Sequence, residues 1–170
     1  MNNAEFRFLI DVPVSTRWRN IELLRASVQS CLEAVFSDVE GSDAIAMVTG
    51  ELLENAVKYG HWTNGTGVFR LRVWGDEETG HIEVENPVGA DDPGPRRVDE
   101  ILAWMDGFAT PEAAYQARML QVAVAPRGTA SGLGLARVVY EGGCRLRAET
   151  SEGMFRMLAE VPLHRGASAG

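Results

Sequence analysis

One helical segment, residues 51–60, constrains the fold and the chemistry of this chain more than any other. At 3.6 residues per turn, Glu51, Asn55 and Lys58 fall on one stripe of a helix. The opposite side of the same helix is apolar and predicts a buried face, formed by Val48, Leu52, Leu53, Ala56 and Val57. A carboxylate, a carboxamide and an ammonium group therefore share one stripe of a helix that packs on a core.

These polar side chains allow two interpretations. The oxygen of Asn55 is a hard ligand of the kind that Mg²⁺ accepts beside water and phosphate. Glu51, one turn earlier, can orient or deprotonate a nucleophile. The alternative is an ordinary solvated helix face, on which Glu54 and Lys58 form an i,i+4 pair.

A glycine-rich turn runs directly into an apolar helix at residues 131–139, Ser-Gly-Leu-Gly-Leu-Ala-Arg-Val-Val. Glycines let backbone N–H groups approach an anion, and the start of a helix adds a partial positive charge. Gly132 and Gly134 are therefore candidates for an anion site, with plain backbone geometry as the alternative.

Composition excludes several classes of protein. The chain has 170 residues and a net charge of −8, which argues against nucleic-acid binding because that needs a basic patch. It has no run of about 18 apolar residues, and its N-terminus lacks the pattern of a signal peptide. We expect a cytoplasmic domain without a membrane span. Cys31 and Cys144 lack metal-ligand spacing and are expected to be buried thiols.

Hydrophobic periodicity predicts an α+β fold. One helix is expected after a cap at Ser15 or Thr16, and a second helix begins at Gly41 and ends at Gly60. Alternating apolar and polar residues predict strands at residues 6–10, 69–73, 82–84, 144–150 and 154–161.

The segment 87–130 differs from the rest and is called the lid below. It opens with prolines and glycines and then has two helical patterns, the second of which begins at Thr110 and Pro111. We expect the lid to be an insertion over one side of the sheet. A single domain is expected over residues 5–163, followed by a disordered tail over residues 164–170.

The order of elements, together with the two motifs, resembles the GHKL (Bergerat-fold) ATP-binding domain of histidine kinases, gyrase-type enzymes and Hsp90. Residues 51–59 are similar to the N-box, and residues 132–135 are similar to the later glycine box. The resemblance spans residues 6–162. It implies a two-layer α/β sandwich with a mixed, mostly antiparallel sheet, covered on one face by helices and carrying a long helical ATP lid.

Within this family the chain looks most like the anti-sigma-factor serine kinases of bacterial partner-switching systems. That resemblance implies that Glu51 is the general base for a serine hydroxyl and that Asn55 ligates the Mg²⁺ of bound ATP. Lys58 and Arg127 are possible phosphate contacts, with solvated surface charge as the alternative for each. The glycine box would offer backbone amides to the phosphates, through Gly132, Leu133, Gly134 and Leu135.

The adenine half of the expected site departs from the family pattern. Asn86 stands where the family has an Asp that accepts a hydrogen bond from adenine, and of the first glycine box only Gly89 is recognisable. The amide of Asn86 can still accept, but without charge. The Thr or Ser that the family has on the last strand falls near Met154.

The expected function is an ATP- and Mg²⁺-dependent protein serine/threonine kinase that acts on an anti-sigma antagonist (STAS-like) or sigma-like regulator. A homodimer is a further possibility. The alternative is a degenerate binding module that docks a signalling partner with weak or no nucleotide turnover. A third hypothesis is an ATPase in which Glu51 activates water.

Overall fold

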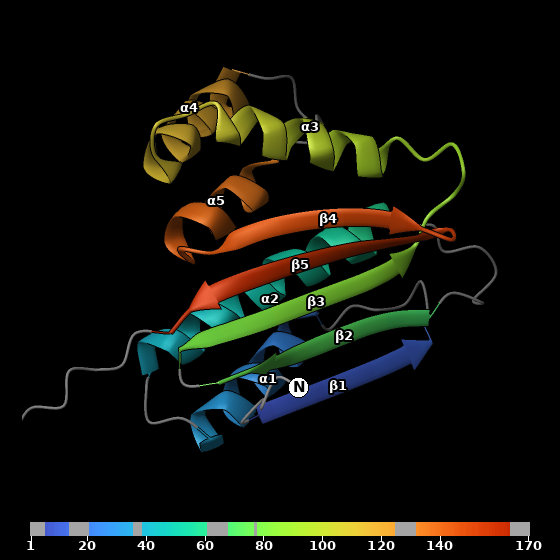
Figure 1. Ribbon diagram of the computed structural model, residues 1–170, viewed down its shortest axis with the longest axis vertical. Helices are drawn as coiled ribbons and strands as arrows, with labels where there is room; N and C mark the ends of the chain where they lie inside the picture. The colour runs from blue at the N-terminus through green and yellow to red at the C-terminus, as the bar shows by residue number, and fades with distance from the viewer. Residues whose placement is uncertain are drawn as a thin grey trace, which may run out of the picture.

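Five strands form one sheet, in the spatial order β1 (Phe6–Pro13), β2 (Val68–Gly75), β3 (Thr79–Pro87), β5 (Met154–Pro162) and β4 (Arg145–Ser151). The computed structural model describes residues 6–13, 21–35, 39–60, 68–76, 78–124 and 132–163. Every neighbouring pair of strands is antiparallel, so the expectation of a mixed sheet is wrong. The strands β3 and β4 run in the same direction, but β5 lies between them and separates them (Figure 1).

Helices cover one face of this sheet. The helices α1 (Ile21–Val35) and α2 (Val39–Tyr59) lie behind the strands in Figure 1, and α5 (Leu133–Glu141) packs on α2. The two helices of the lid, α3 (Gly94–Asp106) and α4 (Pro111–Val124), lie along the β4 edge. This arrangement confirms the predicted two-layer α/β sandwich.

The core lies between the sheet and its helices, and α2 supplies much of it. Val48, Leu52, Leu53 and Ala56 are buried, as the apolar stripe of the 51–60 segment predicted, whereas Val57 of the same stripe is only half-buried. They pack against the inward residues of the strands, since successive strand residues point to opposite faces. The largest fully buried side chains from the sheet are Phe69, Leu71, Val73, Ile82, Val84 and Val161.

Two local expectations were wrong. The helix α2 begins at Val39, so Gly41 lies inside the helix rather than at its start. Cys144 is buried, as expected. Burial raises its pKa to about 12, and its thiol donates a hydrogen bond to the carbonyl of Val138. Cys31, in contrast, is exposed, because the buried residues of α1 follow a different stripe of that helix.

Two other expectations about the fold fall on residues that the structure does not describe: the helix cap at Ser15 or Thr16, and the tail 164–170. Within the described ranges, no helix combines the length and hydropathy that a membrane span requires.

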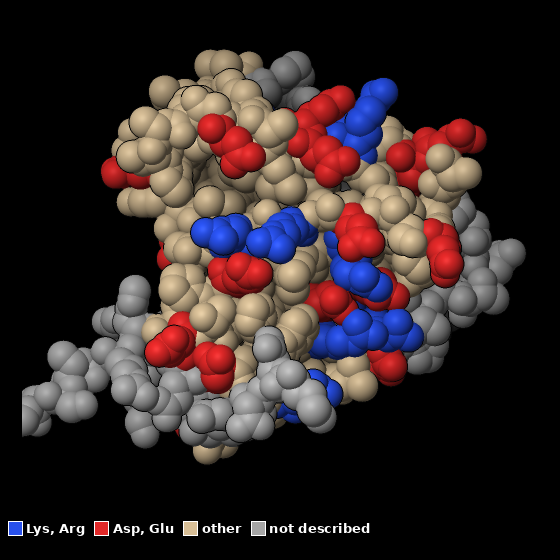
Figure 2. All heavy atoms as spheres, in the orientation of Figure 1, with Lys and Arg blue, Asp and Glu red and all other residues tan. Residues whose placement is uncertain are grey.

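None of the described helices covers the second face of the sheet, which carries charged side chains of both signs (Figure 2). One row crosses all five strands with alternating charge, in the order Asp11, Arg70, Glu85, Arg156, Glu149. Successive N–O distances along the row are 2.9, 3.0, 3.1 and 3.8 Å. Glu85 is the buried member, with a side chain that is only 7% exposed.

Replacing Glu85 by Gln should lower the free energy of unfolding by about 1–2 kcal/mol, because the variant loses the charged acceptor that two arginines share. The loss stays modest because Arg70 and Arg156 are 33% and 41% exposed and can turn to water. Glu149→Gln is the matched control at the exposed end of the row and should change stability by less than about 0.5 kcal/mol. Urea unfolding of both variants measures the difference, and equal losses would contradict this account of the row.

Candidate functional site

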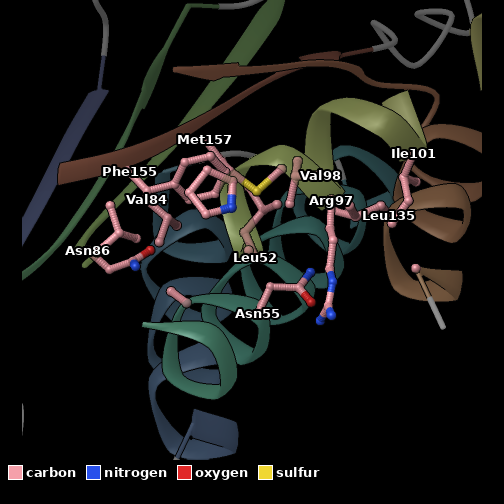
Figure 3. Close-up of a pocket in the computed structure, with 15 residues that line it drawn as sticks. Leu52, Asn55, Val84, Asn86, Arg97, Val98, Ile101, Leu135, Phe155 and Met157 are labelled. Atoms are coloured by element: carbon pink, nitrogen blue, oxygen red, sulfur yellow. The ribbon is translucent and has the colours of Figure 1, made fainter. Parts of the chain in front are cut away.

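A pocket opens where α2, β3, β5, α3 and the start of α5 meet (Figure 3). Its floor and walls are mainly apolar, and its polar groups come from Asn55, Asn86 and Arg97. The lining includes Leu52, Ala56, Val84, Val88, Val98, Ile101, Gly132, Leu135, Phe155 and Met157. The few polar groups in an apolar setting are what a small-molecule site requires to fix the orientation of a ligand.

Four of the residues that the sequence singled out come together in this pocket. Asn55 enters from α2, Asn86 from β3, and Gly132 and Leu135 from the glycine-rich turn and the first turn of α5. These segments are distant in the sequence and meet because β3 and α5 both contact α2.

The carboxamide of Asn55 is the most telling polar group of the pocket. Its Nδ2 atom is buried and makes no hydrogen bond within the described part of the chain. A buried polar group without a partner costs free energy, so such groups call for an explanation. A 180° rotation of the amide exchanges its two atoms and places the oxygen where Nδ2 now lies. In that orientation the pocket has a hard oxygen atom that can ligate a metal ion.

This donor fits Mg²⁺ only in combination with other ligands. Among the described residues, no group of three or more His, Cys, Asp or Glu side chains is placed to hold a metal ion. Magnesium, however, commonly keeps several waters and binds through one or two protein oxygens together with phosphates of a substrate. Asn55 therefore fits as the single protein ligand of a phosphate-bound Mg²⁺.

Asn86 lies on the opposite side of the pocket from Asn55 (Figure 3). It is buried, with 4% exposure, and its Nδ2 donates a hydrogen bond to the carbonyl of Pro87 at 3.2 Å. That bond fixes the amide plane and leaves the side-chain oxygen as the acceptor for a ligand.

The last strand contributes to the pocket, but through other residues than expected. Met154 does not line it, whereas Phe155 and Met157 do. Phe155 pairs with Asn86, and Met157 pairs with Val84, so both face the helices, as the alternation of a strand requires. The part of β5 that lines the pocket is therefore apolar.

The glycine-rich turn places the start of α5 at the pocket. Gly132 precedes the helix in the left-handed region, with φ +58°, which a residue with a Cβ rarely adopts. A Cβ there would lie 2.6 Å from Cδ1 of Ile101. The first backbone N–H groups of a helix have no acceptor within the helix, so this end of the pocket favours an anion. Leu133 and Gly134 do not line the pocket.

Glu51 lies one turn before Asn55, outside the pocket lining, and is held against α5. Its Oε1 accepts a hydrogen bond from Nη1 of Arg137 at 3.2 Å. Its Oε2 lies over Gly134, where a Cβ would come within 2.4 Å of it. Burial raises the pKa of Glu51, and the neighbouring Arg137 guanidinium opposes that rise.

The other predicted residues contribute less, or are not described. The carbonyl of Gly89 accepts the N–H of Asp92 at 3.1 Å in the turn before α3, and Gly89 lies next to the pocket residue Val88 without lining the pocket. The side chain of Lys58 and the whole of Arg127 lie outside the described part of the structure.

Helix α3 forms the roof of the pocket, a role that the sequence analysis missed. Gly94, Arg97, Val98 and Ile101 face the pocket and follow the i, i+3, i+4, i+7 spacing of one helix stripe. That stripe, with one cation among apolar residues, is the signal that could have identified Arg97. Figure 3 shows its side chain extending alongside the carboxamide of Asn55. Because α3 lies close to the other walls, the pocket has a volume of only about 60 Å³.

Comparison with known proteins gave matches only among solved structures. No protein-family model and no curated protein sequence matches the chain. A chain in the crystal structure of the SiaB–SiaC complex from Pseudomonas aeruginosa is similar, with a TM-score of 0.64 and 17% identity over 94% of this chain and 89% of that chain. The catalytic domain of the histidine kinase ThkA gives a TM-score of 0.42 and 15% identity, over 92% of this chain and 96% of that chain. The chain therefore has a GHKL-like fold, as its motifs predicted.

Proposed function

We propose that this chain binds ATP with Mg²⁺ and transfers the terminal phosphoryl group to a serine or threonine hydroxyl of a protein partner. The observation that carries the proposal is the buried amide nitrogen of Asn55, which has no hydrogen-bond partner among the described residues and shares one pocket with the glycine-rich start of α5. Glu51, one helical turn from Asn55, adds the base that a hydroxyl nucleophile needs.

In this proposal, adenine and the phosphates would each lie against pocket residues of complementary chemistry. The oxygen of Asn86 can accept from the amino group of adenine, whose ring would lie against Val84, Phe155 and Met157. The phosphates would lie at Gly132 and the first turn of α5. Arg97 makes no ion pair within the described residues and stands at the same end of the pocket as Asn55.

The chemical step needs little from the protein beyond positioning and one proton acceptor. The hydroxyl oxygen of the partner attacks the γ-phosphorus, the bond from that phosphorus to the bridging oxygen breaks, and ADP leaves with the bond electrons. The hydroxyl proton passes to the carboxylate of Glu51. When bound, Mg²⁺ would neutralise charge on the phosphates while Asn55 holds it in place.

A protein partner is supported by the complex in which a similar chain was crystallised. The similar chain comes from a crystal structure of two different proteins, SiaB and SiaC, in complex. For the present chain we propose a regulatory partner of the STAS-like type, because the N-box most resembles the anti-sigma-factor kinases. The hydroxyl that accepts the phosphate would belong to that partner.

The test is transfer of radiolabelled γ-phosphate to candidate STAS-like proteins encoded by the same genome. The proposal predicts that the partner becomes labelled and that alkali removes the label, as it does from phosphoserine and phosphothreonine. Release of labelled phosphate without a labelled partner would instead support the ATPase. No transfer and no hydrolysis, together with ATP-independent binding of a partner, would support the binding module.

The binding module remains the second candidate because two observations favour it. The enclosed volume of about 60 Å³ is far below the roughly 300–1,000 Å³ of typical ligand pockets, and the acceptor at Asn86 is uncharged. If the chain binds nucleotide, α3 must move outward, since Ile101 packs directly over Gly132.

Removing that contact should favour nucleotide binding. Ile101→Ala should tighten ATP binding by about 3–10-fold, because it weakens the closed position of α3 and so raises the fraction of molecules able to bind. Met119→Ala, on the exposed side of α4, is the matched control and should leave the affinity unchanged. Calorimetry measures both variants.

Hydrogen exchange gives the same prediction a second readout. In the ligand-free protein, the amides of α3 should exchange faster than those of β3, and ATP should change the rates in α3 most. Equal protection of α3 and the sheet, with an unchanged affinity in Ile101→Ala, would contradict a gating role for the lid.

A further inference from the structure

The carboxylate of Glu51 is fixed by one stripe of α5. Gly134, Arg137 and Glu141 follow at spacings of three and four residues, so they lie on the same side of that helix. Glu51 contacts the first two of them, through Oε2 over Gly134 and through Oε1 to Arg137. The glycine box and the candidate base are thus joined by direct contacts between α5 and α2.

Arg137 is itself oriented by a second carboxylate. Its Nε donates to Oε2 of Glu141 at 2.7 Å, while its Nη1 donates to Glu51 at 3.2 Å. The Arg137 side chain is 44% exposed and that of Glu51 only 20% exposed. Among the described residues, the cation beside this partly buried carboxylate is Arg137, and Arg137 is held in turn by Glu141, which lies nearer the solvent.

We propose that Arg137 is a positioning residue for Glu51, which keeps the base ionised and aimed for proton transfer, and that Glu141 holds Arg137 in place. This inference rests on the proposed function, because it gives the arrangement a purpose in phosphoryl transfer. It also gives Gly134 a role in the arrangement, since a methyl group there would displace the Glu51 carboxylate. Neither role depends on a contact between Arg137 and the nucleotide.

The charges around Glu51 show what removal of Arg137 would do. Burial is the largest influence on the Glu51 pKa and raises it, and the charges of Glu54 and Glu141 act in the same direction. Arg137 acts in the opposite direction, both by its charge and by its hydrogen bond. Without that cation the influences that remain among the described residues, which are burial and the charges of Glu54 and Glu141, favour the protonated form, which cannot accept a proton.

The experiment compares Arg137→Gln with Arg137→Lys, which keeps the charge. Carbon-detected NMR titration of the ligand-free protein reports the pKa of Glu51, with Glu51→Gln used to assign the signal. The pKa should rise by about one unit or more in Arg137→Gln and by much less in Arg137→Lys. In phosphoryl transfer, the acid limb of the pH profile should move to higher pH by the same amount, while ATP affinity stays unchanged.

The two readouts separate this inference from the proposed function. A Glu51 pKa that is the same in wild type and Arg137→Gln would overturn the positioning role, whatever the activity. A raised pKa with an unmoved acid limb would also overturn it. A raised pKa in a protein that never transfers phosphate would overturn the kinase, and with it the purpose of the arrangement, while the ion pair itself would stand.

Discussion

Replacing Glu51 by Gln should reduce phosphoryl transfer by about 10²–10⁴-fold, the range that a positioned general base contributes. The amide is nearly the same size as the carboxylate but cannot accept the proton of the attacking hydroxyl. ATP affinity should stay within about twofold of wild type, because a base that touches only the nucleophile contributes to transfer and not to nucleotide binding. The measurement is single-turnover transfer, with calorimetry for the affinity.

Glu54→Gln is the matched control for this prediction. Glu54 is exposed and lies on the same helix three residues later, so the change in net charge is equal, and transfer should continue at the wild-type rate. Transfer at the wild-type rate in Glu51→Gln would instead identify Glu51 as a structural partner of Arg137 and Gly134, with no role in proton transfer.

Replacing Asn55 by Ala should abolish Mg²⁺-dependent ATP binding without harming the fold. The amide would supply the protein's oxygen ligand to Mg²⁺, and an alanine methyl group has no donor atom. The free energy of unfolding should be unchanged or higher by up to about 1 kcal/mol, because alanine favours helices and the variant no longer buries an unpaired amide nitrogen. Loss of binding together with retained stability is the signature of a functional residue.

Asn86→Ala provides the comparison for the other end of the pocket. It should weaken ATP binding while the remaining binding still depends on Mg²⁺, because Asn86 lies on the adenine side. Calorimetry with and without Mg²⁺ distinguishes the two variants. An unchanged ATP affinity in Asn55→Ala would remove Asn55 from the metal site.

The sequence was sufficient for the elements whose pattern is local. The apolar stripe of α2 and the alternation in β2 and β3 follow from the periods of helix and strand, and both are buried as predicted. The glycine-rich turn also carried its own signal, since Gly132 has a left-handed backbone and the helix α5 begins directly after it. These local patterns, in their order, were enough to predict the fold.

The contacts between distant segments could not be predicted in the same way. The ion pair of Glu51 with Arg137 depends on how α5 crosses α2, and nothing near either residue in the sequence specifies that crossing. The roof formed by α3 has the same origin. Met154 lies outside the pocket lining while its neighbour Phe155 lies within it, because a shift of one residue turns a strand side chain to the other face.

The central claim is that this pocket binds ATP through Mg²⁺, and equilibrium binding to the wild-type chain tests it most directly. Calorimetric titration with ATP should show saturable 1:1 binding in excess Mg²⁺ and much weaker binding in EDTA, because Asn55 would hold the nucleotide through the metal. The same titration of Asn55→Ala should show no difference between the two conditions. Equal affinity of the wild type with and without Mg²⁺, or no binding in either, would contradict the account.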